Sequence, residues 1–279
     1  MSDGLQHALA VFGVMSPQRL ARTGVADIYR VRRGRGRAVV KIYRRGDAGN
    51  EATGLTLMQT AASPALPRIL SRTDAAVLIE YLDGPTLGQM SREGRDDEAA
   101  EHLARTARVL HLTLQKLPVA PFAPLDQWLT PLWDLTTGPS CPADLAQDMQ
   151  RSIGLARRLL ATTVLHHPLH GDLHHDNVIL TADGPRAFDA KGLVGDPAFE
   201  LANALRNPKG IPDRLRDPDR IRHDLTLYAK ALKVPAPRLA AWAAVKCAHS
   251  IALRSKGPLA FDTEADLLQL LLAQAPDAV

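Results

Sequence analysis

The 279-residue sequence is poor in cysteine and has no long apolar run. Its two cysteines, Cys141 and Cys247, lie far apart, so neither a disulfide framework nor a Cys-x-x-Cys metal site is available. No apolar stretch approaches the roughly 18 residues that span a bilayer. Residues 1–15 have neither a basic start nor a small-residue cleavage site, so we expect no signal peptide. These absences favour a cytoplasmic protein with reduced thiols.

Positive charge is in slight excess and is not concentrated in one place. The formal net charge is +4, and the densest basic patch runs from Arg32 to Arg37. Two glycines within that patch favour the solvated tip of a hairpin over a nucleic-acid surface. We therefore expect neither a nucleic acid nor a membrane as partner. The length and the 46% hydrophobic content fit one or two globular domains with an ample core.

The pattern along the chain changes near Gly84. Before it we predict strands and one short helix, over residues 28–31, 38–43, 51–58 (the helix) and 77–82. After it the pattern is mainly helical, with predicted helices over 96–117, 145–164, 199–205, 220–232 and 238–253 and short strands near 178–180 and 186–189. We predict an α+β fold with a small β-rich lobe, residues 1–83, and a larger helical lobe, residues 84–279. Such a junction is a common place for a ligand cleft.

The most informative segment is Leu-His-Gly-Asp-Leu-His-His-Asp-Asn, residues 169–177. Asp172 and Asn177 are separated by four residues, which is the spacing of a kinase catalytic loop, and Asp189 follows twelve positions later. A hydroxyl nucleophile needs a carboxylate to accept its proton, the role we predict for Asp172. A triphosphate needs divalent metal held by oxygen ligands, the role we predict for Asn177 and Asp189. The order of these residues, with Asn177 opening one short strand and Asp189 ending the next, is what makes the pattern specific.

The N-terminal third contains the other residues that such chemistry requires. Lys41 lies mid-strand within Ala-Val-Val-Lys and is predicted to bridge nucleotide phosphates, while Glu51 at a helix start would hold it. The alternatives are a solvent-facing strand lysine and an acid favoured by the helix dipole. Glu80 and Leu82 lie where the lobes meet, and we expect main-chain contacts to a nucleobase there.

A second informative segment lies at 188–202 and reads Phe-Asp-Ala-Lys-Gly-Leu-Val-Gly-Asp-Pro-Ala-Phe-Glu-Leu-Ala. Together with the segments above, it resembles the aminoglycoside phosphotransferase family. The resemblance is greatest to the streptomycin 6-phosphotransferase and hydroxyurea phosphotransferase branch of that family. The resemblance implies a two-lobed protein-kinase-like fold that uses ATP and Mg²⁺ to phosphorylate a hydroxyl of a small molecule. It implies Asp172 as catalytic base, Asn177 and Asp189 as metal ligands, and Lys41 with Glu51 as the phosphate-anchoring pair.

The sequence also departs from that pattern. No Gly-x-Gly-x-x-Gly precedes Lys41, and Glu200 stands where the family usually has aspartate. His174 replaces the lysine of serine/threonine protein kinases, and no activation-loop motifs follow Asp189, which disfavours the alternative of a protein kinase. A non-catalytic pseudokinase is the other alternative, and the intact set of polar residues argues against it.

The acceptor is not identified by the sequence. Residues 205–260, which are expected to border it, contain twelve Lys or Arg and four Asp or Glu. A polycationic sugar would prefer an acidic wall. ATP versus GTP, the oligomeric state and the roles of His174, Lys191, Asp196 and Glu200 also stay open.

Overall fold

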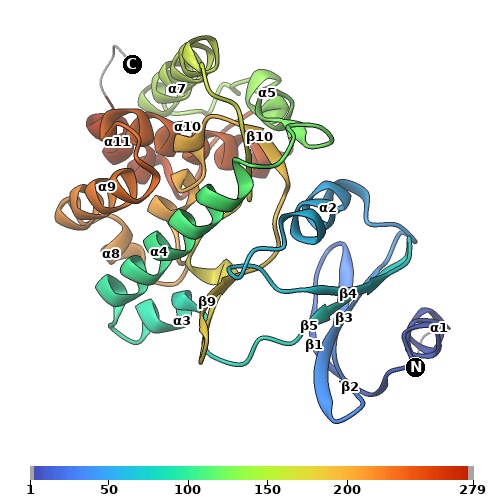
Figure 1. Cartoon of the computed structure of the whole chain (residues 1–279). Coiled ribbons are helices and arrows are strands. Elements are labelled where there is room, and N and C mark those ends of the chain that lie inside the picture. Colours follow the sequence, from blue (N-terminus) through green and yellow to red (C-terminus); the bar gives the residue numbers. More distant parts are fainter. Residues whose placement is uncertain (1–2, 276–279) are drawn as a thin grey trace.

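The computed structural model describes residues 3–275. Figure 1 shows a sheet-containing N-terminal region beside a larger helical region, so the predicted α+β class is confirmed. The N-terminal region contains α1 (Asp3–Phe12), β1 (Met15–Arg22), β2 (Ala26–Arg33), β3 (Gly36–Tyr43), the 3-10 turn η1 (Gly49–Glu51), α2 (Ala52–Ala61), β4 (Ile69–Arg72) and β5 (Ala76–Glu80).

The sheet has the order β1-β2-β3-β5-β4, and all neighbouring strands are antiparallel. The glycine-rich basic patch is the predicted hairpin tip, with Arg33 paired to Gly36 and Gly34 at φ +58°. The sequence prediction missed β1 and β4. β1 is an almost fully exposed strand without apolar alternation, so periodicity gives no signal for it.

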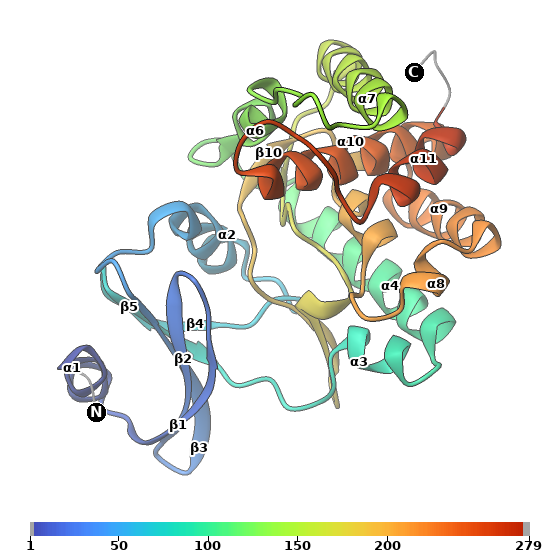
Figure 2. The same cartoon turned by 180° about the vertical axis from the view of Figure 1, so that it is seen from behind.

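The two faces of the sheet differ, as the strand alternation predicts. One face carries Val31, Val40 and Leu78, which pack against α1. The other face carries Lys41 and Tyr43 and is directed toward α2 and the helical region. Figures 1 and 2 show α1 on the side of the sheet away from the helical region. Burial of one face under α1 therefore leaves the opposite face free to form a ligand site.

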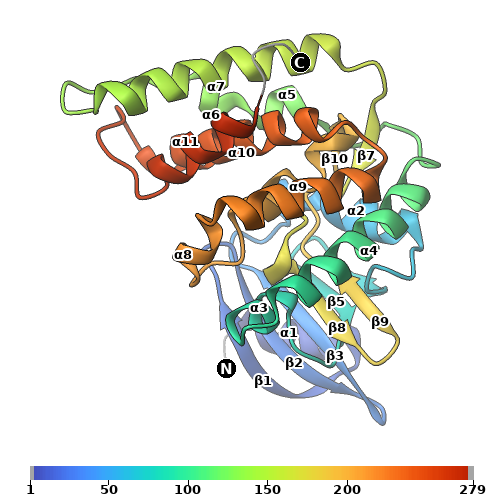
Figure 3. The ribbon, with the colours of Figure 1, turned by 90° about the vertical axis from the view of Figure 1, so that its left-hand side faces the viewer.

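The helical region is built around α10 (Ala236–Ser255), which is buried along most of its length. Small residues, including Ala240 and Ala244, let its neighbours approach closely. Figure 3 shows α7, α11 and α9 stacked around it. The remaining helices are α3 (Leu87–Arg92), α4 (Asp96–Leu114), α5 (Leu125–Trp128), α6 (Thr130–Trp133), α7 (Ala143–Thr162), α8 (Pro212–Leu215), α9 (Pro218–Leu232) and α11 (Ala265–Gln274).

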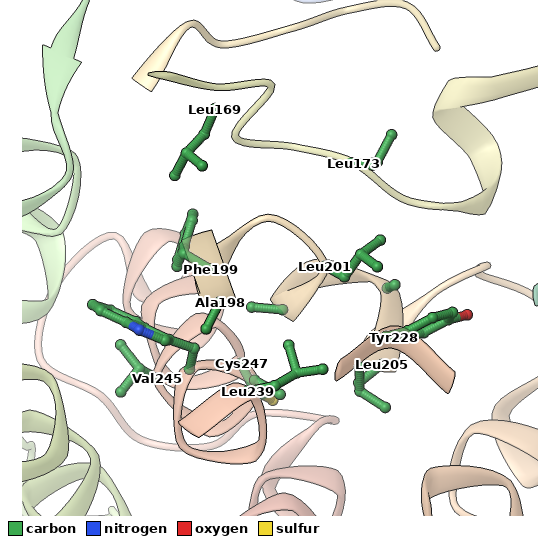
Figure 4. Close-up of a cluster of buried hydrophobic side chains, with 14 of the residues drawn as sticks. Leu169, Leu173, Ala198, Phe199, Leu201, Leu205, Tyr228, Leu239, Val245 and Cys247 are labelled. Atoms are coloured by element: carbon green, nitrogen blue, oxygen red, sulfur yellow. The ribbon is translucent and has the colours of Figure 1, made fainter. Parts of the chain in front are cut away.

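Short strands and 3-10 turns connect these helices to the predicted catalytic loop. They are β6 (Ala123–Pro124), β7 (His167–Leu169), η2 (His175–Asn177), β8 (Val178–Thr181), β9 (Gly184–Ala187), β10 (Leu193–Gly195), η3 (Pro197–Phe199) and η4 (Ala202–Arg206). The loop rests on a buried apolar cluster, in which Leu169 and Leu173 lie above Phe199 and Leu201 (Figure 4). This packing anchors the loop on the core of the helical region.

Several predicted boundaries were wrong. The strand predicted over 77–82 ends at Glu80, which places Leu82 after the strand. The strand predicted to end at Asp189 stops at Ala187, because Asp189 has a left-handed backbone, φ +62°. Asn177 closes the turn η2 instead of opening β8, and the helix predicted over 199–205 is replaced by two 3-10 turns. Among residues 3–275, no helix is long and apolar enough to cross a membrane.

Candidate active site

The loop that follows β7 is held by a buried histidine. The His170 Nε2 atom bonds the Phe188 carbonyl oxygen at 3.0 Å, and the Asp172 backbone N–H donates to His170 Nδ1 at 3.4 Å. Burial lowers the pKa of His170 to about 4, so the ring is neutral. Because a carbonyl can only accept, Nε2 carries the proton and Nδ1 is the acceptor. His170 therefore fixes the loop by hydrogen bonding.

Glu200 holds the backbone of the same loop. Its Oε2 accepts the backbone N–H of His170 at 2.9 Å. Burial raises the pKa of Glu200 to about 8 despite the hydrogen bonds from His170 and Gly171. Glu200, which stands where the family usually has aspartate, thus braces the backbone of the catalytic loop. Asp196, by contrast, caps η3 through the Ala198 N–H and binds Arg238 at 2.6 Å, so it is a structural anchor.

Asp172 is held by two different partners, one on each carboxylate oxygen. Asn203 donates to Oδ1 at 2.8 Å, and Lys191 Nζ lies 3.6 Å from Oδ2. Burial acts to raise the pKa of Asp172, but the attraction of Lys246, His174 and Lys191 outweighs it and lowers the pKa overall. The carboxylate is therefore ionised and oriented, as a proton acceptor needs to be.

Lys191 joins Asp172 to Asp189. Its ammonium lies 3.3 Å from Asp189 Oδ2 and 3.6 Å from Asp172 Oδ2. Burial opposes ionisation of Asp189, but Lys191 and Lys41 outweigh it and lower the pKa of Asp189 to about 2. The two carboxylates, seventeen positions apart in sequence, thus share one cation.

Lys41 reaches the same place from the sheet. Its ammonium lies 2.5 Å from Glu51 Oε2 and 3.2 Å from Asp189 Oδ1. The side chains of Lys41 and Glu51 are each 13% exposed, so Lys41 is not a solvent-facing strand lysine. The pair brings β3, the start of α2 and the segment after β9 together at one point.

α2 also touches the segment after Asp189 directly. Thr53 Oγ1 donates to the Lys191 carbonyl oxygen at 2.8 Å, and a side chain at Gly54 would overlap the Ala190 carbonyl. Only glycine permits this close approach. The contact couples the position of Glu51 to that of Asp189.

Asn177 lies next to Asp189 through backbone pairing. The Phe188 N–H donates to the Asn177 carbonyl oxygen at 2.9 Å, and Asn177 Nδ2 donates to the Asp172 carbonyl oxygen at 3.0 Å. The bond from Nδ2 leaves the amide oxygen available as a ligand. One carboxylate and one amide oxygen, completed by phosphate oxygens and water, match the preference of Mg²⁺, so the residues present fit that ion.

A cavity of about 690 Å³ opens in front of these groups. Its lining includes Lys41, Glu51, Glu80, Leu82 and Asp189, together with apolar side chains from β2, β3, β5 and α2. Five of the seven predicted site residues therefore line a single cavity, whereas Asp172 and Asn177 are not among its lining residues, and Asp172 is linked to it through Lys191.

Glu80 and Leu82 contribute differently to that cavity. The Glu80 N–H donates to the Arg68 carbonyl oxygen at 3.0 Å, and the Glu80 carboxylate binds Arg186 at 2.9 Å. Within residues 3–275, no acceptor takes the Leu82 N–H. Leu82 thus offers the free main-chain donor that the sequence analysis expected in this region.

Sequence reasoning missed Asn203 and left Lys191 and Lys246 without a role. Asn203 follows Glu200 by three residues, a spacing that places two side chains on one side of a tight turn. That spacing was the available signal: Glu200 braces the loop backbone, and Asn203 orients the Asp172 carboxylate.

Known proteins resemble this chain in sequence. The profile of the aminoglycoside/hydroxyurea antibiotic resistance kinases matches residues 13–257. The chain is 35% identical over 203 residues to a streptomycin 3''-kinase of Klebsiella pneumoniae, covering 72% of this chain and 70% of that protein.

Solved structures share the fold at low sequence identity. A thermostable mutant of aminoglycoside phosphotransferase APH(4)-Ia, crystallised with ADP and hygromycin B, superposes with a TM-score of 0.66 at 13% identity and 98% coverage of both chains. Choline kinase LicA of Streptococcus pneumoniae gives a TM-score of 0.63 at 15% identity, covering 97% of this chain and 96% of LicA.

Proposed function

The chain belongs to the aminoglycoside/hydroxyurea antibiotic resistance kinase family, and from this premise we propose that it transfers the γ-phosphate of Mg²⁺-bound ATP to a hydroxyl of streptomycin or a related aminoglycoside. Family membership makes it a small-molecule phosphotransferase acting on hydroxyl groups. Streptomycin is the substrate named by the Klebsiella pneumoniae relative.

The observation that carries the assignment of roles is the position of Lys191 between Asp189 and Asp172, at 3.3 and 3.6 Å. Asp189 faces the cavity that suits a nucleotide, and Asp172 lies on the far side of the same ammonium. A phosphoryl group passing from one side to the other would travel past Lys191, whose positive charge stabilises the charge developing on the transferred group.

We assign the residues as follows. Lys41, held by Glu51, binds the nucleotide phosphates, and the Leu82 N–H with the Glu80 segment receives the base. Asp189 and Asn177 would hold Mg²⁺, which when bound neutralises phosphate charge. Residues 1–83 form the nucleotide-binding lobe and residues 84–279 the catalytic and acceptor-binding lobe.

Asp172 performs the proton transfer in this proposal. Asn203 fixes Oδ1, so the carboxylate cannot rotate freely and its remaining lone pairs point to one place. An acceptor hydroxyl at that place would donate its proton to Asp172 as its oxygen attacks phosphorus. The low pKa of Asp172 keeps it in the accepting form at neutral pH.

The test is ADP release by the purified protein with ATP and Mg²⁺ in the presence of streptomycin, hygromycin B or hydroxyurea, with mass spectrometry of the product. We expect streptomycin to stimulate ADP release and to gain one phosphoryl group. If ATP binds and every one of these acceptors stays unmodified, the proposed acceptor is wrong, and a nucleotide-binding pseudokinase becomes the better interpretation.

A further inference from the structure

A buried lysine on α10 lies behind Asp172. Lys246 is 5% exposed, and its ammonium donates to Ser250 Oγ, one helical turn later, at 3.3 Å. Within residues 3–275 no carboxylate lies within 4 Å of it. Burying an ammonium without an ion-pair partner is costly, so a purpose beyond packing is required to explain it.

Lys246 acts on the catalytic carboxylate electrostatically and does not belong to the lining of the nucleotide cavity. After the effect of burial, its attraction is the largest interaction on Asp172. In turn, burial lowers the pKa of Lys246 to about 8, while Asp172 opposes this shift. Lys191 belongs to the lining of the nucleotide cavity, whereas Lys246 and Asn203 lie outside it among the described residues. Lys246 therefore influences Asp172 from outside the nucleotide cavity, where an acceptor would also have to be bound.

Two further buried nitrogen atoms belong to His249, on which the charge of Lys246 acts, and to Trp128, whose ring faces His249. His249, three residues later on α10, donates from Nε2 to the Trp128 carbonyl oxygen at 3.0 Å. Burial lowers the pKa of His249 to about 3, so its Nδ1 is an unprotonated acceptor. The centroids of the His249 and Trp128 rings lie 5.8 Å apart. Among the described residues, neither His249 Nδ1 nor Trp128 Nε1 has a hydrogen-bond partner. Such orphaned groups are rare in folded proteins unless a ligand or water completes them.

We propose that Lys246, His249 and Trp128 form the acceptor subsite and that it binds uncharged oxygen-bearing groups next to the phosphorylated hydroxyl. This inference rests on the proposed function. A sugar hydroxyl can donate to His249 Nδ1 and accept from Lys246 or Trp128, and so it satisfies the groups that the protein leaves open.

The subsite also selects the orientation of a cationic acceptor. An ammonium or guanidinium group has no lone pair for Lys246 and is repelled by it. The cationic groups of an aminoglycoside therefore lie away from α10, and its hydroxyl-bearing face lies toward it. The excess of basic residues over 205–260 is thus compatible with an aminoglycoside. In this orientation the ammonium of Lys246 faces hydroxyl oxygen atoms of the acceptor and not its cationic groups.

The experiment measures streptomycin binding by calorimetry in the presence of AMP-PNP and Mg²⁺, alongside steady-state kinetics. Lys246→Met keeps the side-chain length and removes the cation, and Trp128→Phe keeps a ring and removes the N–H. Lys230→Met, which removes an exposed charge from α9, is the matched control. We expect Lys246→Met to weaken streptomycin binding about 10- to 100-fold, the range for a lost hydrogen bond to a charged donor.

Trp128→Phe should weaken streptomycin binding by about tenfold or less, as expected for one neutral hydrogen bond. In both variants the KM for ATP should stay within about twofold of wild type, a separation that general unfolding would not produce. Because the buried charge is removed, Lys246→Met should melt at or above the wild-type temperature.

Two results would overturn the inference. Unchanged streptomycin affinity in Lys246→Met would show that the ammonium does not touch the acceptor. Tighter binding would show that the ammonium only repels it. If the wild-type protein binds streptomycin without phosphorylating it, the proposed function fails. The inferred subsite is then tested separately, by the streptomycin affinities of the two variants.

Discussion

The sharpest prediction concerns the substitution Asp172→Asn. Asparagine keeps the shape of the side chain, and its carbonyl oxygen can still accept from Asn203, as Asp172 Oδ1 does at 2.8 Å. The variant loses the negative charge and the lone pairs that receive the hydroxyl proton. Because Asp172 is not part of the nucleotide cavity lining, nucleotide affinity should be kept.

The magnitude follows from the chemistry of proton transfer at a fixed position. A positioned general base contributes roughly 10²- to 10⁴-fold, which corresponds to about 3 to 5 kcal/mol of transition-state stabilisation. We place Asp172→Asn at the upper end, because Lys191 at 3.6 Å would also lose one of its two carboxylate partners. The loss should appear in kcat with little change in the KM for ATP.

The matched control is Asp176→Asn, the same chemical change four positions later in the loop. The Asp176 carboxylate binds Arg92 at 2.9 Å and is directed toward α3. We expect this variant to retain wild-type kcat and to lose at most about 1 kcal/mol of stability, as is usual for a partly exposed ion pair.

The assay is ADP release with streptomycin, combined with calorimetric binding of ADP to each variant. Our reasoning is refuted if Asp172→Asn retains more than about one tenth of the wild-type kcat. A loss of less than about tenfold is smaller than the contribution of a general base. It is equally refuted if Asp176→Asn loses as much activity, because the loss would then reflect loop disturbance.

Three further predictions follow from the contacts of the site. Lys41→Met leaves Glu51 without its cation and Asp189 with Lys191 alone, and should lower kcat/KM for ATP by about 10²-fold; unchanged nucleotide kinetics would contradict this. Burial raises the pKa of Glu200 from 4.5 to about 8, so the folded state holds an extra proton and stability falls as pH rises through that range. Glu200→Gln should remove this slope in urea unfolding at pH 5 to 8, and an identical slope would refute the assignment. Gly54→Ala would overlap the Ala190 carbonyl and should cost about 1–3 kcal/mol in the same assay, whereas Gly154→Ala, in a roomier helix position, should stabilise by up to about 1 kcal/mol.

The sequence could predict those site residues whose proximity in space is determined by their spacing within one segment of the chain. Asp172 and Asn177 share a loop, and Asp189 follows a two-stranded turn, so their proximity needs only local structure. Lys41 and Glu51 were predictable for a different reason. Each is a charged residue at a position where burial would be costly without a partner, which implies that a partner exists.

The acceptor side could not be predicted in this way. Lys246 lies in Ala-Ala-Val-Lys-Cys-Ala-His, where a single lysine on an alanine-rich helix is indistinguishable from a solvent-facing residue. Its burial arises because α7, α9 and α11 surround α10, and its proximity to Asp172 arises because η4 packs between α10 and the loop. Both are properties of tertiary packing with no local pattern. In the proposed subsite, single substitutions on α10 would therefore be enough to change the acceptor within one shared fold, while the phosphate-handling residues are constrained by their spacing.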